Sequence, residues 1–384
     1  MSNIFRLITV LLLFYFICPK IPAYAAENPL AVANNKIGIH VLSESELDNA
    51  AALVNSNGGA WGYVLIPIQA GDQNLEKWQK FMDRCRKDRV IPILRLATED
   101  DYFNTQVWRE PTPMDIVDFA NFLNSLNWPT KNRYVIVFNE VNRGDEWGGS
   151  ANPAEYAQLL SFAVTVFKSK SSDFFMISAG LDNAAPDLGT KYINEYTYLN
   201  LMNAAVPGIF NQLDGLSSHS YPNPGFSQPP DPNSPKGVAS FTFERNAIKQ
   251  MTTKTLPIFI TETGWSSEAV PDDTRVQYYQ QTFNTIWNDK DIVAITPFLL
   301  QAGAGPFEKF TFITASGALT KQYKLIQSMP KVRGVPSFPT RSVLGSTDKK
   351  TIVDSRNFTD FKIPKRSFSV VTVMENVFNY IIGN

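Results

Sequence analysis

The chain has 384 residues, of which 44% are hydrophobic, 12% aromatic and 18% charged, so it is long enough to bury a large globular core. A formal net charge of -1 excludes the strongly basic balance that is typical of nucleic-acid binders. Beyond residue 25 the chain holds one cysteine, Cys85, and two histidines, His40 and His219. We therefore expect no internal disulfide, no dedicated metal centre and no cofactor.

The N-terminus has the pattern of a targeting segment. Arg6 precedes an apolar run from Leu7 to Cys18, which is too short to cross a bilayer comfortably. Ala23-Tyr24-Ala25 then fits a small-residue cleavage site. We predict that residues 1–25 are a signal peptide, that the protein is secreted and that the mature chain has no membrane span. An uncleaved anchor is the alternative.

From residue 36 onward, short apolar runs alternate with helical patterns. Strands are predicted at 37–41, 63–66, 91–96, 134–138, 174–179, 213–218, 258–262 and 292–295. Helices are predicted around 47–54, 75–85, 116–123, 152–167, 191–204, 243–251, 276–286 and 319–329. Eight such alternations within residues 36–330 predict an α/β fold, a single (β/α)8 TIM barrel. Cys85 falls on the apolar stripe of its helix, so we expect it in the core.

Two loops and the tail differ from this pattern. Residues 221–236 contain six prolines, which favour neither sheet nor helix, and residues 301–312 are rich in glycine and carry three phenylalanines. Both follow predicted strands, and the loops at that end of a barrel shape the substrate cleft. Residues 331–384 are expected to form a short C-terminal appendage of unknown role that folds back on the barrel.

Two of the apolar runs lead directly into a glutamate. Residues 134–138 are followed by Asn139 and Glu140, and residues 258–261 by Glu262. The carboxyl ends of all strands of a parallel barrel open on one face, so both acids should meet over one cleft. Two facing carboxylates are what hydrolysis of a glycosidic bond needs. His219 and Tyr221, after the sixth strand, could donate hydrogen bonds that keep Glu262 ionised.

The two glutamates are expected to differ in role. Glu140 is the better acid, because an apolar approach and the nearby Trp147 should favour its protonated form. Asn139 can hydrogen-bond a sugar hydroxyl beside the reacting carbon. We expect Trp147 and Trp265 to face the sugar, with core packing as the alternative.

These residues resemble clan A of the glycoside hydrolases, which are retaining (β/α)8 enzymes that include cellulases, β-glucanases and β-xylosidases. The resemblance rests on Asn139-Glu140 after the fourth strand, Glu262 at the end of the seventh and His219-x-Tyr221 between them. It implies that Glu140 is the acid/base and Glu262 the nucleophile. It also implies that Tyr221 touches the nucleophile and that His219 lines the cleft. Arg95 matches the arginine that many members place near the nucleophile. His40 is a further candidate for the cleft, with a structural role as the alternative.

The chain departs from the clan in two places. Val141 stands where a proline usually follows the acid/base, and no tryptophan follows the eighth strand as a platform for a sugar ring. Phe298 or Phe307 could take the place of that tryptophan. Asp145 and Glu146 are interpreted as loop charges.

The sequence thus predicts a secreted retaining glycoside hydrolase, acting on a polysaccharide or oligosaccharide with β linkages. The alternatives are a carbohydrate-binding barrel without turnover and a transglycosylase that remodels wall glycan.

Overall fold

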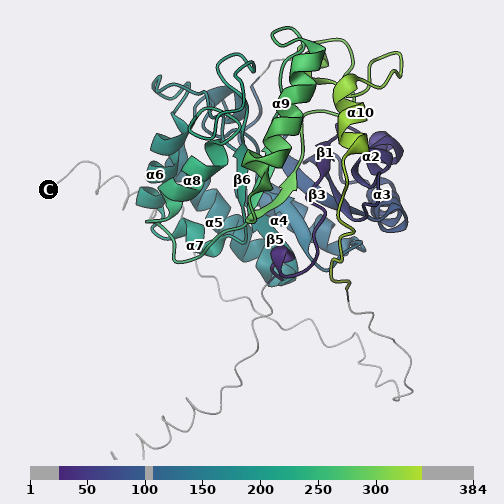
Figure 1. Cartoon of the computed structure of the whole chain (residues 1–384). Coiled ribbons are helices and arrows are strands. Elements are labelled where there is room, and N and C mark those ends of the chain that lie inside the picture. The colour runs from purple at the N-terminus through teal and green to yellow at the C-terminus, as the bar shows by residue number, and fades with distance from the viewer. Residues whose placement is uncertain (1–25, 100–106, 340–384) are drawn as a thin grey trace, which may run out of the picture. The chain divides into compact units, whose positions relative to one another are not determined.

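The computed structural model describes residues 26–99 and 107–339, which lie within one compact unit, Met1–Thr340 (Figure 1). The predicted signal peptide and the part of the tail beyond residue 339 fall outside the described residues, so both remain expectations. No helix in the described ranges has the length and apolar character needed to cross a membrane.

Eight strands in the described residues run parallel to their neighbours, in the order predicted from the apolar runs. β1 to β5 form one sheet and β6 to β8 a second. Single parallel bridges, Ile37 to Ile295 and Ile177 to Gly215, link the two sheets at both edges. The strands are β1 Gly38–His40, β2 Gly62–Gln69, β3 Val90–Ala97, β4 Arg133–Ile136, β5 Phe174–Ile177, β6 Leu216–His219, β7 Ile258–Glu262 and β8 Ile292–Ile295.

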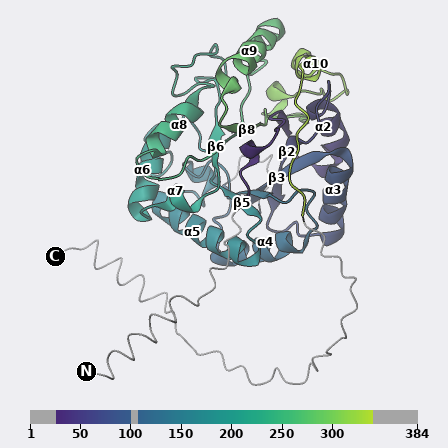
Figure 2. The same ribbon diagram turned by 60° about the horizontal axis from the view of Figure 1, so that its bottom comes forward.

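The helices form a ring around the strands, as Figure 2 shows. The α-helices are α2 Leu47–Val54, α3 Leu75–Asp88, α4 Pro113–Ser125, α5 Pro153–Lys170, α6 Glu195–Ala205, α7 Ile209–Gln212, α8 Ser240–Ile248, α9 Asp272–Asn284 and α10 Lys321–Ser328. Short 3-10 helices are η1 Pro29–Ala31, η2 Glu44–Glu46, η3 Gly144–Glu146, η4 Ile286–Asn288 and η5 Glu308–Phe310. The alternation of strands and helices confirms the predicted α/β fold.

Capping residues explain where several helices begin. α6 starts at Glu195, four residues later than predicted, because the Asn194 side chain accepts a hydrogen bond from the Tyr196 amide and caps the helix there. α4 begins with a proline after a capping box formed by Thr112 and Asp115.

The strands separate two hydrophobic clusters. On β2, Val64, Ile66 and Ile68 belong to the large cluster shared with the helices, whereas Tyr63 and Leu65 belong to the smaller cluster between the strands. This alternation follows from the two-residue period of a strand. Cys85 is fully buried in the larger cluster, as predicted.

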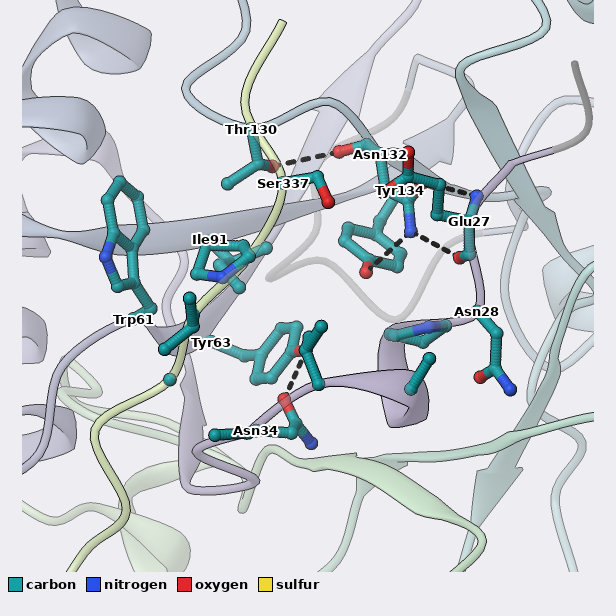
Figure 3. A pocket seen from close by; sticks show the side chains of 17 residues that line it. Glu27, Asn28, Asn34, Trp61, Tyr63, Ile91, Thr130, Asn132, Tyr134 and Ser337 are labelled. Atoms are coloured by element: carbon teal, nitrogen blue, oxygen red, sulfur yellow. Dashed lines mark hydrogen bonds between the residues drawn. The ribbon is translucent and has the colours of Figure 1, made fainter.

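Residues 331–339 close the end of the fold where the strands begin. Arg333 bridges to Ala60, and the Lys131 amide donates to the Ser337 carbonyl at 2.8 Å. Beneath them lies a cavity of about 290 Å³, lined by aromatic side chains that include Tyr63 and Tyr134 (Figure 3). Its polar groups bond to one another, since the Asn132 amide donates to the Tyr134 hydroxyl at 3.1 Å.

Candidate active site

The two predicted catalytic glutamates lie at the carboxyl ends of their strands. Glu262 is the last residue of β7, and Glu140 follows β4 after three further residues. The backbone at Phe138 and Glu140 is left-handed, with φ of 69° and 36°. Such conformations cost energy in residues other than glycine and are concentrated at functional sites. The Glu140 amide donates to the Gly180 carbonyl at 2.9 Å, which fixes this turn against the loop after β5.

The structure brings the two carboxylates together with His219 between them. One oxygen of Glu140, one oxygen of Glu262 and a ring nitrogen of His219 all lie within 4.8 Å of one another. His219 Nδ1 is 3.0 Å from Glu140 Oε1 and 3.8 Å from Glu262 Oε2. Gly180 makes room for this ring, because a Cβ there would lie only 2.2 Å from His219 Cδ2. The imidazole therefore touches both acids.

Glu262 is surrounded by donors and positive charge. Arg95 on β3 forms an ion pair with Oε1, and the Tyr221 hydroxyl donates to Oε2 at 3.0 Å. Burial alone would raise the pKa of Glu262, but the charges of His219 and Arg95 outweigh burial and lower that pKa to about 2. The carboxylate is thus ionised at neutral pH, as a nucleophile must be.

His40 lies next to Glu262 in the interior of the fold. Its Nδ1 lies 3.6 Å from Glu262 Oε1, and its ring meets Phe298 edge-on with centroids 5.0 Å apart. Burial and the charge of Arg95 lower the pKa of His40 to about 3, so its ring is neutral. It is fully buried and does not line the cleft, which corrects the expectation of a sugar contact.

Charged side chains, and not an aromatic wall, surround Glu140. Arg143 Nη1 lies 3.4 Å from Glu140 Oε2, and the same guanidinium reaches Asp145 at 2.7 Å and Asp182 at 3.6 Å. Trp147 is 1% exposed and packs against Phe138, with its Nε1 donating to Glu155 at 3.1 Å. This placement corrects the expectation that Trp147 faces sugar.

Trp265 also lies in the core. It is 1% exposed, packs edge-on against Tyr279 and donates from Nε1 to the Gln228 carbonyl at 2.8 Å. Its position corrects the expectation of sugar contact and indicates another role. The indole fastens the proline-rich loop of residues 221–236 to the segment that follows Glu262.

A cleft of about 410 Å³ opens above the two glutamates. Of the residues predicted for the site, Asn139, Glu140, Tyr221 and Glu262 line it, whereas Arg95 borders a small adjoining cavity. His219 touches both acids from below without lining the cleft. One wall is aromatic, with Phe226 and Phe310 edge-on at 5.1 Å. The complete lining is Trp108, Asn139, Glu140, Arg143, Glu146, Asp182, Ala184, Tyr221, Asn223, Phe226, Glu262, Phe298, Phe307 and Phe310.

Several lining residues were not predicted from the sequence. Arg143 and Asp182 form an ion pair at the edge of the cleft, and Glu146 was interpreted as a loop charge. The only available signal was position, since Arg143 and Glu146 closely follow Glu140, and Asp182 closely follows β5. Phe298 and Phe307, the suggested replacements for the missing tryptophan, both line the cleft.

Glu140, His219 and Glu262 meet the geometric requirement for three ligands of a metal ion. Their surroundings oppose a cation, because Arg95 pairs with one carboxylate and Arg143 lies beside the other. The arrangement fits acid–base and nucleophilic chemistry better than metal binding.

Comparison with protein-family models and with curated proteins found no match. Comparison with solved structures found glycoside hydrolases. A family 39 glycoside hydrolase from Bacteroides cellulosilyticus WH2 matches with TM-score 0.55 and 16% identity, over 79% of this chain but only 64% of that chain. A GH39 β-xylosidase from Caulobacter crescentus matches with TM-score 0.54 and 14% identity, over 77% and 72%. GH5_18 from Streptomyces cattleya, in complex with GlcNAc, matches with TM-score 0.56 and 13% identity, over 77% and 79%.

At these identities the likeness establishes the fold. The chain has the (β/α)8 TIM-barrel fold that these glycoside hydrolases share, as predicted from the sequence.

Proposed function

We propose that the protein is a retaining glycoside hydrolase that cleaves β-linked glycans by double displacement. The observation that carries this proposal is the separation of the two acids, which have carboxylate oxygens within 4.8 Å of each other. Retaining enzymes hold their carboxyl groups about 5 Å apart, whereas inverting enzymes separate them by about 6.5–9.5 Å to admit a water. The solved structures that share the fold support the same class of enzyme.

In the first step, a carboxylate oxygen of Glu262 attacks the anomeric carbon as the bond to the leaving oxygen breaks. Glu140 gives its proton to that oxygen. Tyr221 and Arg95 hold the two Glu262 oxygens and so aim the nucleophile. The product is a glycosyl ester on Glu262.

In the second step, Glu140 takes a proton from water, whose oxygen bonds to the anomeric carbon while the ester bond to Glu262 breaks. The sugar is released with its original anomeric configuration, and both glutamates return to their starting state. His219 Nδ1, 3.0 Å from Glu140, is well placed to hydrogen-bond the Glu140 carboxylate that remains after proton transfer.

The cleft favours a glycan as the ligand. Aromatic rings form one wall and charged side chains the other, so a bound sugar can pack its apolar face on one side and hydrogen-bond on the other. Phe298 and Phe307, with centroids 5.2 Å apart, offer this apolar surface in place of an indole.

The test is a screen of the purified protein against β-glucans, xylan, mannan and galactan, with reducing ends as the readout. Glu262→Ala should lower turnover by roughly four orders of magnitude or more. Glu140→Gln should lose turnover on natural glycans but retain part of it on activated aryl β-glycosides, which need no acid. Equal loss on both substrates would contradict the role of Glu140.

The same screen separates the alternatives. Tight binding of a polysaccharide without release of reducing ends would indicate a carbohydrate-binding barrel. Products longer than the substrate, formed when acceptor is abundant, would indicate a transglycosylase.

We also propose that the chain is exported and cleaved after Ala25. The support is the pattern of a charged residue, an apolar run and small residues at positions 6–25. N-terminal sequencing of protein recovered from the culture medium or periplasm should begin at Ala26. An intact N-terminus on membrane-bound protein would contradict cleavage.

A further inference from the structure

Glu146 lies in the cleft beside the catalytic pair but has no part in the double displacement. It is the last residue of η3, and its amide donates to the Arg143 carbonyl at 3.3 Å. Its half-buried side chain lines the main cleft together with Glu140 and Glu262. It also lines the adjoining cavity together with Trp108, so this carboxyl group stands where the two spaces meet.

Glu146 accepts one hydrogen bond from the side chain of Asn139. The Asn139 side-chain oxygen accepts from Arg95 Nη1 at 2.7 Å, so the amide nitrogen is on the opposite side. That nitrogen donates to the Glu146 carboxyl. Hydrogen bonds thus link Arg95 through Asn139 to Glu146, whose side chain lines the cleft.

The charges around Glu146 favour its protonated form. Burial is the largest cause and the negative charge of Glu140 the second, while Arg143, Arg95 and the Asn139 hydrogen bond act in the opposite direction. Burial and the charge of Glu140 outweigh the opposing effects and raise the pKa of Glu146 to about 8. At neutral pH this group therefore accepts from Asn139 with one oxygen and carries a proton that it can donate.

We propose that Glu146 binds the glycan directly, donating a hydrogen bond from its carboxyl group to a hydroxyl of the sugar residue that lies against Trp108 and Asn139. The proposal rests on the proposed function and adds a specificity-determining residue to it. A half-buried donor in a cleft selects ligands that supply an acceptor, because a ligand without one leaves the donor unpaired.

A pH profile distinguishes this role from a structural one. Above about pH 8, Glu146 loses its proton and with it the donor, and gains a negative charge beside Glu140. KM for an aryl β-glycoside that the wild-type protein hydrolyses should then rise. Glu146→Gln keeps an acceptor for Asn139 and a donor for the sugar but does not titrate, so its KM should stay level across the same range. Glu308→Gln, at an exposed position near the cleft, is the matched control and should follow the wild type.

Removal of the side chain gives a second readout. Glu146→Ala should raise KM at pH 7 by about tenfold, the equivalent of one hydrogen bond, with a smaller change in kcat. An unchanged KM in Glu146→Ala, or the same alkaline rise in Glu146→Gln as in the wild type, would overturn the proposal.

Failure of this proposal can be told from failure of the proposed function. If the wild type hydrolyses a glycoside and the Glu146 variants match it at every pH, only the role of Glu146 is wrong. If no glycoside is hydrolysed, titration of Trp fluorescence with cellobiose, xylobiose and mannobiose measures whether Glu146 contributes to binding. Binding by the wild type that weakens about tenfold in Glu146→Ala supports the contact, whereas equal binding or none overturns it.

Discussion

Two pairs of glutamates lie side by side in this protein, and they have different surroundings. Glu140 and Glu262 face a cleft and have cationic neighbours, with Arg95 paired to one and His219 in contact with both. Glu195 on α6 and Glu244 on α8 are 1% and 2% exposed and hydrogen-bonded to each other. The charges that act on Glu195 are those of other acids, whereas Glu244 is influenced by the charge of His219, which is outweighed by burial.

Within the second pair, hydroxyl groups hydrogen-bond to Glu244. The Ser218 hydroxyl donates to Glu244 Oε1 at 2.6 Å, and Ser240 donates to the same oxygen at 3.0 Å. Burial raises the pKa of both glutamates, most strongly for Glu195, where the charge of Glu244 adds to burial. Glu195 therefore holds the proton and donates it toward Glu244.

Burial alone therefore does not decide whether a carboxyl group is ionised. Burial raises the pKa of a carboxyl in both places, but only at Glu262 do neighbouring cations reverse the effect. Glu262 thereby presents an ionised oxygen to an open cleft. Glu195 and Glu244 share a proton where α6 and α8 pack near β6, and the role of this pair is structural.

The largest effect should come from the structural pair. Glu244→Ala leaves Ser218, Ser240 and Glu195 without their shared acceptor, and we expect a loss of about 3 kcal/mol in the free energy of unfolding. Urea denaturation would measure it. Glu268→Ala, at a side chain that is 75% exposed, is the control and should change stability by less than about 0.5 kcal/mol. Equal stability of the two variants would show that the network contributes nothing.

Tyr221→Phe tests the hydrogen-bond donors around Glu262, the proposed nucleophile. It removes the 3.0 Å hydrogen bond to Glu262 and keeps the ring in the aromatic wall. Hydrogen bonds to charged groups contribute about 1.5–3 kcal/mol, so kcat should fall roughly ten- to a hundredfold with little change in stability. Steady-state kinetics on an aryl β-glycoside would show it. A kcat equal to that of the wild type would mean that Arg95 and His219 suffice.

The pH dependence of stability should reveal the shared proton. Because the folded-state pKa of Glu195 is raised above its ordinary 4.5, the native state binds this proton more tightly than the unfolded chain. This contribution is complete below about pH 4.5 and declines as the pH rises toward the raised value. Glu195→Gln does not titrate, so it should lose less stability than the wild type between pH 5 and pH 9. The free energy of unfolding in urea would be measured at several pH values. If it changed with pH equally in Glu195→Gln and the wild type, the shared proton would be excluded.

The smallest effect should come from Trp147→Phe. The variant loses the hydrogen bond from Nε1 to Glu155 and part of the packing on Phe138, which together should cost about 1 kcal/mol of stability. Because Trp147 lies in the core, KM should not change. A KM several times higher would indicate that Trp147 contacts the sugar and would contradict its placement in the core.

The sequence predicted the eight strands and the two glutamates because both depend on local patterns. An apolar run that leads into a carboxylate marks a strand end, and the barrel order then brings Glu140 and Glu262 to one face. Trp147 and Trp265 could not be assigned this way, since an aromatic residue after a strand has the same local signal whether it faces the cleft or the core. Burial decides between them, and burial depends on distant residues such as Glu155 and Gln228.

The environment of Glu146 also could not be predicted from the sequence. As one of two adjacent acids in a short loop it resembles a solvated charge, and its position shortly after Glu140 is the one sequence signal to the contrary. Its environment comes from Asn139 and Arg95, which the barrel brings together from β3 and the end of β4. Perturbed carboxyls of this kind follow from tertiary contacts and not from composition.

Double displacement requires that Glu262 form a covalent bond to the sugar. An activated 2-deoxy-2-fluoro β-glycoside of the preferred sugar slows the second step and traps the glycosyl ester. Mass spectrometry of the digested protein should then find one added glycosyl group, on the peptide that contains Glu262, and none in Glu262→Ala. Label on another residue, or time-dependent hydrolysis that releases the inverted anomer without any label, would contradict the account.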